Sequence, residues 1–155
     1  MKTPLEIVQT LLTNPTNLEH VRGLTTPDVT YVSLNFENPE LRKVLPWAGT
    51  NHGPQSIVDA FEGIGSVWET KAFEVRDVVA DDKNVALFGS FTYKARKLGK
   101  EITSPFALLA KLTGDRISYI QFMEDTFGTA SSFRSGGTWH FTGVAAGGDV
   151  SVGSP

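Results

Sequence analysis

Residues 117–126 have the sequence Ile-Ser-Tyr-Ile-Gln-Phe-Met-Glu-Asp-Thr, which is typical of a long strand. The predicted strand ends on two adjacent carboxylates, Glu124 and Asp125. Side chains alternate between the two faces of a strand, so these carboxylates are expected to point in opposite directions. One face holds Ile117, Tyr119, Gln121, Met123 and Asp125. If that face is the inner one, Asp125 lies at the mouth of an apolar pocket and Glu124 lies on the surface or in an interface.

Short turns join this strand to three preceding strand-like segments. The four segments are residues 71–80, 84–96, 101–112 and 116–125. The turns between them are rich in Asp, Gly and Lys, which predicts an antiparallel meander. Pro105 interrupts the third segment and cannot donate to a ladder, so we expect a bulge or kink there that bends the sheet.

Three helices are expected before the meander. Thr3-Pro4-Leu5-Glu6 combines a capping residue, a proline in the first turn and a glutamate three residues after the cap. Asn14-Pro15 begins a second, short helix. Gly53-Pro54 begins the third, whose apolar stripe needs a sheet to pack against. That stripe consists of Ile57, Phe61, Ile64 and Trp68.

One strand and one long loop are predicted between the second and third helices. Val29–Leu34 is a β-branched strand segment. Residues 35–51 contain Pro39, Pro46, Trp47 and Gly49, which predicts irregular structure. Such a loop can form a lid or wall of a site, and it can equally be a surface loop anchored by Trp47.

Length and charge restrict the class of protein. A chain of 155 residues is expected to form one domain with a real core. The net charge of −3 provides no basic field for nucleic acid or an anionic membrane surface. The absence of cysteine excludes thiol chemistry, and His20 and His140 have no ligand spacing, so we expect no metal and no cofactor. Without a signal peptide or a long apolar segment, a cytoplasmic protein is predicted.

Both faces of the predicted sheet are apolar, although helices can cover only one of them. The second face is therefore expected to form a homodimer. The residues predicted for that interface are Phe88, Ala107, Leu109, Ile120 and Phe122.

The composition changes at residue 135, and residues 135–155 form a glycine-rich tail. Residues 138–142 alternate like a strand, and residues 150–152 could pair with them. A disordered tail is the alternative. We expect partial order as short strands, with Trp139 and Phe141 packed on the body or on a partner. Without such packing, these two side chains would expose a large apolar area.

The order of these elements resembles the NTF2-like superfamily, and within it the SnoaL-like and ketosteroid-isomerase-like proteins. The resemblance covers residues 3–133, and its specific local matches are residues 52–57 and 122–126. It implies an α+β fold, a cone-shaped barrel in which three N-terminal helices pack on a strongly bent, mostly antiparallel sheet. It also implies a domain over residues 1–134, a buried hydrophobic pocket and a dimer formed through the convex sheet face.

In polyketide-cyclase members of this family, an aspartate near the end of the last strand acts as acid and base, and the resemblance gives that role to Asp125. Two differences from the family pattern restrict the reactions that are expected. Residues 4–14 contain no tyrosine, which disfavours steroid isomerisation as the family performs it. The chain has no Arg-x-Asp sequence, which disfavours the epoxide-hydrolase branch.

The residues also support specific roles in such a pocket. A desolvated Asp125 would have a pKa raised toward neutrality, as a general base for a carbon acid requires. Its alternative role is the N-cap of a short following helix. His52 is an expected donor to an oxyanion, and Tyr31 and Tyr93 are alternative donors. His52 can equally be merely exposed, and each tyrosine can equally be a core residue with a satisfied hydroxyl. The residues expected to bind substrate are Trp47, Phe61, Phe91, Tyr93, Phe106, Tyr119, Gln121 and Met123.

The function predicted from the sequence is that of a cofactor-free isomerase, cyclase or lyase acting on a small apolar carbonyl compound. The alternative is a ligand-binding or dimeric assembly module of the same fold without catalysis. A closed pocket would favour the alternative, since fold alone does not confer function.

Overall fold

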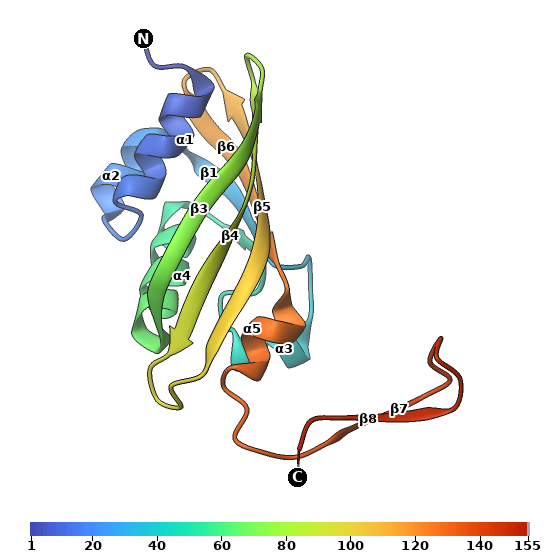
Figure 1. Cartoon of the computed structure of the whole chain (residues 1–155). Helices are drawn as coiled ribbons and strands as arrows, with labels where there is room; N and C mark the ends of the chain where they lie inside the picture. The colour runs from blue at the N-terminus through green and yellow to red at the C-terminus, as the bar shows by residue number, and fades with distance from the viewer. Residues whose placement is uncertain (155) are drawn as a thin grey trace.

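The protein has a mixed α+β fold, in which helices pack against one side of a strongly curved sheet (Figure 1). The computed structural model describes residues 1–154. The helices are α1 Pro4–Thr13, α2 Leu18–Leu24, α3 Pro39–Val44, α4 Pro54–Val67 and α5 Thr126–Ser131. No helix within the described residues is long and apolar enough to cross a membrane.

Six strands form the main sheet, in the order β2-β1-β6-β5-β4-β3. They are β1 Thr25–Ser33, β2 Gly49–His52, β3 Trp68–Ala80, β4 Asn84–Ala95, β5 Glu101–Thr113 and β6 Arg116–Glu124. The predicted meander is confirmed as β3 to β6, and only the β1–β6 pair is parallel. The sheet is curved like part of a cone. It does not close into a full barrel, because β2 and β3 remain at its edges.

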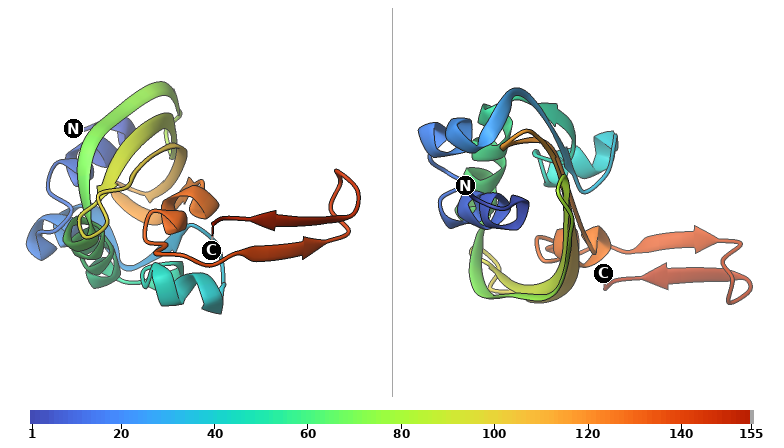
Figure 2. Two further views of the ribbon diagram at one scale, coloured as in Figure 1. Left: turned by 60° about the horizontal axis from the view of Figure 1, so that its bottom comes forward. Right: turned by 90° about the horizontal axis from the view of Figure 1, so that it is seen from above.

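The three predicted helices cover the concave face of the sheet (Figure 2). The predicted cap of α1 is confirmed, since the Glu6 amide donates to the Thr3 hydroxyl over 3.2 Å and the Thr3 amide donates to the Glu6 carboxylate over 2.7 Å. Val8 and Leu11 of α1 and Ile57 of α4 are fully buried against the sheet. The core therefore lies between these helices and the concave face.

The segment from residue 35 to residue 51 is more regular than predicted. Asn38 caps α3 by accepting a hydrogen bond from the Leu41 amide over 3.0 Å, and Pro39 occupies the first turn. Gly49, at a φ of +115° that favours glycine, then starts β2, which pairs with β1. The prediction of wholly irregular structure is wrong because capping and the edge of β1 supply enough hydrogen bonds to order the segment.

The bends of the sheet lie away from Pro105. The β4–β5 register runs without interruption past Pro105, so the predicted bulge there is wrong. The irregularities lie in β3, next to Lys71 and Arg76, and in β6, next to Ser118. Gly89 permits the tight approach of β3, because a Cβ atom there would clash with the Glu74 carbonyl oxygen.

The tail contains β7 Trp139–Thr142 and β8 Asp149–Val152, which pair as an antiparallel hairpin. The hairpin projects away from the body, on the side of the sheet opposite the three covering helices (Figures 1 and 2). At the base of the hairpin, the Trp139 ring meets Phe127 of the body at 5.4 Å between centroids.

Candidate functional site

A one-residue irregularity in β6 determines which carboxylate faces the interior. Ile117 pairs with Leu112, whereas Tyr119 pairs with Lys111, so Ser118 has no regular partner. Alternation restarts after this bulge, and Ile120 and Phe122 face the core. The predicted assignment of faces is wrong for residues 119–125, because a slip of one residue moves every later side chain to the opposite face.

Glu124 is consequently the carboxylate that faces the interior. It lies opposite Phe106 of β5, a buried residue of the concave face. Its Oε2 atom and the Thr129 hydroxyl of α5 are both inaccessible to solvent, and neither makes a hydrogen bond of good geometry within residues 1–154. A buried carboxyl oxygen without a partner is costly in a native fold and marks a functional candidate.

Two buried tyrosines share this region with Glu124, and the three groups influence one another electrostatically. Burial raises the pKa of the Glu124 carboxyl to about 7; the Thr129 hydroxyl opposes this shift and the charge of Asp125 adds to it. Burial, with the charge of Glu124 adding to it, raises the pKa of Tyr31 to about 12. Burial and then Glu124 and Tyr31 raise the pKa of Tyr93 well above its usual range. The site thus combines a carboxyl that titrates near neutrality with two neutral hydroxyl donors.

Asp125 has the alternative role named above, as the N-cap of a short following helix. Its side chain accepts a hydrogen bond from the Gly128 amide over 3.0 Å and caps α5. Its own amide donates to the Ser104 hydroxyl over 2.9 Å. Asp125 is exposed, so it lies outside the apolar interior in which a general base was expected.

Three of the predicted substrate-binding residues lie on the convex face. The Tyr119 hydroxyl donates to Gln121 over 2.9 Å, and the Gln121 amide contacts the Met123 sulfur at 3.5 Å. The Lys111 ammonium lies 5.2 Å from the Tyr119 ring centroid. This row of contacts runs along the outside of β6, so it cannot line the interior.

His52 is also separated from Glu124. It is exposed at the end of β2, where Nδ1 lies 3.4 Å from the Thr30 hydroxyl. Thr30 is level with Tyr119 on β6, five residues before Glu124, which corresponds to roughly 16 Å along a strand. The described residues contain no cluster of three His, Asp or Glu side chains that could hold a metal ion.

The remaining predicted binding residues do line the interior, and aromatic rings fill much of it. Tyr93 stacks on Trp68 at 5.0 Å between centroids and meets the Phe91 ring at a tilt at 4.1 Å. Trp47 meets Trp68 edge-on at 5.8 Å. Phe61 packs against the same core, and Phe106 is buried there.

Sequence reasoning missed Glu124, Phe73 and Phe122 as residues of this site. The Phe106 ring stacks on Phe73 at 4.8 Å and on Phe122 at 5.4 Å, which extends the aromatic row from β3 to β6. One signal in the sequence could have placed Phe122 and Glu124 inside. Ile120 and Phe122 are together more apolar than Tyr119 and Gln121, which favours the opposite phase of alternation.

The concave face stays open along β3. Phe73, Val75 and Val78 face the same side as the buried residues of β4 but remain exposed. Because Phe73 stacks on Phe106 and Phe106 lies opposite Glu124, a row of apolar side chains connects this exposed margin to the carboxyl. A separate surface hollow of about 310 Å³ lies at the base of the hairpin, among Lys100, Ser131 and Arg134, away from this path.

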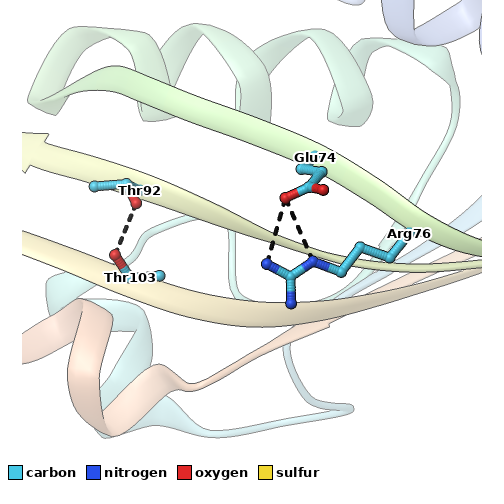
Figure 3. Close-up of polar contacts among 4 residues, drawn as sticks. All are labelled: Glu74, Arg76, Thr92 and Thr103. Carbon is cyan, nitrogen blue, oxygen red and sulfur yellow. Dashed lines mark hydrogen bonds and ion pairs between the residues drawn. The ribbon is translucent and has the colours of Figure 1, made fainter.

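The convex face has a polar part and an apolar part. Figure 3 shows the polar part, where the Thr92 and Thr103 hydroxyls lie 2.7 Å apart and Arg76 pairs with Glu74 at 3.3 Å. The apolar part follows along β4, β5 and β6, where Phe88, Ala107 and Met123 form one cross-strand row. The predicted interface residues Ile120 and Phe122 lie on the concave face instead, because the bulge at Ser118 shifts the alternation of β6 by one residue.

Fold and site together define a small-molecule-binding protein of the NTF2-like type. The family model of the SnoaL-like domain matches residues 10–120. This chain belongs to that family, which confirms the resemblance stated from the sequence.

Two curated relatives extend the comparison. The chain is 48% identical over 118 residues to patulin synthesis protein F of Aspergillus clavatus, covering 74% of this chain and 60% of that protein. It is 40% identical over 139 residues to patulin biosynthesis cluster protein F of Penicillium expansum, covering 86% of this chain and 70% of that protein. The chain therefore spans between three fifths and seven tenths of the length of these relatives.

A solved structure supports the fold. An NTF2-like protein from Burkholderia thailandensis has a TM-score of 0.71 and 19% sequence identity, covering 86% of this chain and 99% of that chain. At that identity the likeness concerns the fold alone.

Proposed function

We propose that the protein catalyses a proton-transfer step, an isomerisation, cyclisation or elimination, on a small apolar carbonyl compound, with Glu124 as the general acid and base. The observation that carries this proposal is the inward Glu124 carboxyl, whose Oε2 atom is buried beside the Thr129 hydroxyl without a hydrogen bond of good geometry and whose pKa is raised to about 7. A carboxyl with a pKa near the working pH can both take and return a proton.

Tyr31 and Tyr93 supply the second half of the chemistry. When Glu124 removes a proton next to a carbonyl group, negative charge develops on the carbonyl oxygen. Both tyrosines stay neutral because burial raises their pKa, so each can donate a hydrogen bond to that oxygen. The proton on Glu124 then returns to another carbon of the substrate or to its leaving group, and no cofactor is needed.

A substrate is proposed to reach Glu124 from the open margin at Phe73. The rings of Phe73 and Phe106 stand between solvent and the carboxyl, so they must rotate or shift as the ligand enters. An apolar, flat compound fits this route because it can replace the ring-to-ring contacts that it disturbs. The names of the curated relatives lead us to propose that the compound is an intermediate in the synthesis of patulin or of a similar small molecule.

The test is complementation of a Penicillium expansum strain that lacks its patulin biosynthesis cluster protein F. We expect the wild-type chain to restore patulin and Glu124→Gln not to restore it at an equal protein level. Gln has nearly the shape of Glu but cannot exchange a proton, so it separates chemistry from packing. Full restoration by Glu124→Gln would overturn the proposed role of Glu124.

A non-catalytic assembly module is the second candidate, and one observation favours it. The rings around Trp68 pack at 4.7 to 5.8 Å between centroids, so this part of the interior is occupied by side chains. A module of this kind would restore patulin whether residue 124 were Glu or Gln, so the same assay separates the two candidates.

We also propose that the protein is a homodimer through its convex sheet face. Phe88 and Met123 are about half exposed there, in a row with Ala107, and Leu109 lies in the adjacent row. The polar residues of Figure 3 border this patch. An apolar centre with a polar rim is the arrangement found in stable protein interfaces.

A further inference from the structure

The C-terminal hairpin has one apolar face, whose two aromatic side chains remain exposed within the described residues 1–154. Trp139 pairs with Val152 and Phe141 pairs with Val150, so these four side chains share a face. His140 and Ser151 occupy the other face, where they are 2.9 Å apart. Trp139 and Phe141 stay exposed although both strands are formed.

An isolated two-stranded hairpin is at best marginally stable in water. This one is held to the body only at its base. The Arg134 guanidinium donates to the Ser154 carbonyl over 3.0 Å and to the Gly136 carbonyl over 3.2 Å, which ties the two ends of the tail together. The contact of Trp139 with Phe127 adds a second attachment. The base is thereby positioned, while the apolar face further out still needs a surface to pack on.

We infer that the hairpin is a clasp that packs its apolar face on the convex sheet of a second copy of this chain. The inference rests on the homodimer proposed above. The hairpin projects on the convex side of its own sheet and away from its own body, so the hairpin extends into the space that a partner on that side would occupy (Figure 2). A two-fold pair would place each hairpin beside the sheet of the other protomer.

The apolar area available on one chain suits a stable dimer. The exposed fractions are 53% for Phe127, 55% for Trp139, 36% for Phe141, 46% for Phe88 and 48% for Met123. With 150–250 Å² for a large side chain, these five residues offer roughly 500 Å². A stable interface buries about 800 Å² per partner. The sheet patch and the hairpin together therefore supply more than half of that area as apolar side chains, and neither does so alone.

The clasp is a property of this chain and not of the family domain. The family match ends at residue 120, whereas the hairpin begins at Trp139. Of the two apolar surfaces, only the sheet patch lies in part within the matched residues.

The test measures the dimer dissociation constant by sedimentation equilibrium. The double variant Trp139→Ser, Phe141→Ser removes the apolar face of the hairpin. We expect dimerisation to weaken on the order of 30-fold, as for the loss of interface hot spots. The matched control is His140→Ser, Thr142→Ser, which changes the opposite face of the same strand and should leave the constant within about threefold.

A second measurement shows where the hairpin packs. Trp139 is the exposed tryptophan, whereas Trp68 is buried. Quenching of tryptophan fluorescence by iodide should therefore be low in the wild-type dimer and high in Phe88→Asp, which alters only the sheet. Equal quenching in the two proteins would overturn the clasp, since the hairpin would then not lie on the partner's sheet.

The outcomes distinguish the clasp from the dimer. A wild-type protein that is monomeric at micromolar concentration overturns both. A wild-type dimer whose constant is unchanged by the Trp139 and Phe141 substitutions overturns the clasp and leaves the sheet interface standing. Neither result bears on Glu124, which the complementation assay tests separately.

Discussion

Glu124 and Asp125 are adjacent in sequence and have opposite environments. The Glu124 carboxyl is buried beside Thr129, whereas the Asp125 carboxylate caps α5 at the surface. The bulge at Ser118 produces this arrangement, because it sets the phase of alternation for the end of β6. The proposed proton transfer therefore falls to Glu124, whereas Asp125 caps the helix.

Stability should fall as the pH rises through neutrality because of Glu124. Its pKa is raised from 4.5 to about 7 in the folded protein, so the folded state binds this proton more tightly than the unfolded state does. The contribution of Glu124 to the free energy of unfolding is fully present below pH 4.5 and is lost as the pH rises through 7. The free energy of unfolding should fall by roughly 3 kcal/mol over this range. Urea unfolding at pH 5 and pH 8 measures it. In Glu124→Gln this component should vanish, and an unchanged pH dependence would contradict the raised pKa.

Asp125 should matter for stability through its cap. Asp125→Ala removes the acceptor for the Gly128 amide and should cost about 1 kcal/mol in the free energy of unfolding. Asp125→Asn is the matched control, since Asn caps equally well and should cost little. Chemical denaturation of the two variants checks the order. If both variants lost the same stability, the carboxylate would have a role other than capping.

Two glycines of α4 should respond oppositely to alanine. A Cβ atom at Gly63 would lie 2.8 Å from the Trp47 ring, whereas a Cβ atom at Gly65 meets nothing within 4 Å. Gly65→Ala should gain up to about 1 kcal/mol from helix propensity. Gly63→Ala should be less stable than Gly65→Ala by about 1–3 kcal/mol, because Trp47 must shift. Thermal unfolding monitored by circular dichroism tests this difference, and equal effects would show that Trp47 does not pack on α4.

Charging the convex face should separate the proposed dimer. Phe88→Asp places a carboxylate at the β4 end of the apolar row with Ala107 and Met123, where a dimer would bury it. Leu98→Asp is the control, an exposed apolar residue in the turn after β4 and away from that row. Light scattering should give a monomer for Phe88→Asp and a dimer for Leu98→Asp. Dimers for both variants would place the interface elsewhere.

The sequence predicts the fold of this chain well because the signals for that fold are local. The capping box at Thr3 and Glu6 and the turns of the meander each depend on a few neighbouring residues, and the structure has them where they were expected. Short-range capping also orders α3, although the prolines of that segment suggested irregular structure. Local chemistry therefore fixes the elements and most of their order.

The interior end of the site could not be predicted in the same way. Which of Glu124 and Asp125 faces inward depends on a single bulge at Ser118, and the local sequence indicates it only through the more apolar pair Ile120 and Phe122. The distance between His52 and Glu124 depends in turn on how β2 and β6 align with β1. Register among distant strands is a property of the assembled sheet, so this part of the prediction failed while the fold was correct.

One measurement tests the central claim most directly, namely the patulin titre of the complemented Penicillium expansum strain with Glu124→Gln and Asp125→Asn expressed at equal levels. General acid–base catalysis contributes about 10²- to 10⁴-fold to a rate, so Glu124→Gln should lower the titre to about a hundredth of the wild-type value or less. Asp125→Asn keeps the cap and should retain at least about half of that value. The reverse pattern, with Glu124→Gln active and Asp125→Asn inactive, would contradict the assignment of the proton transfer to Glu124.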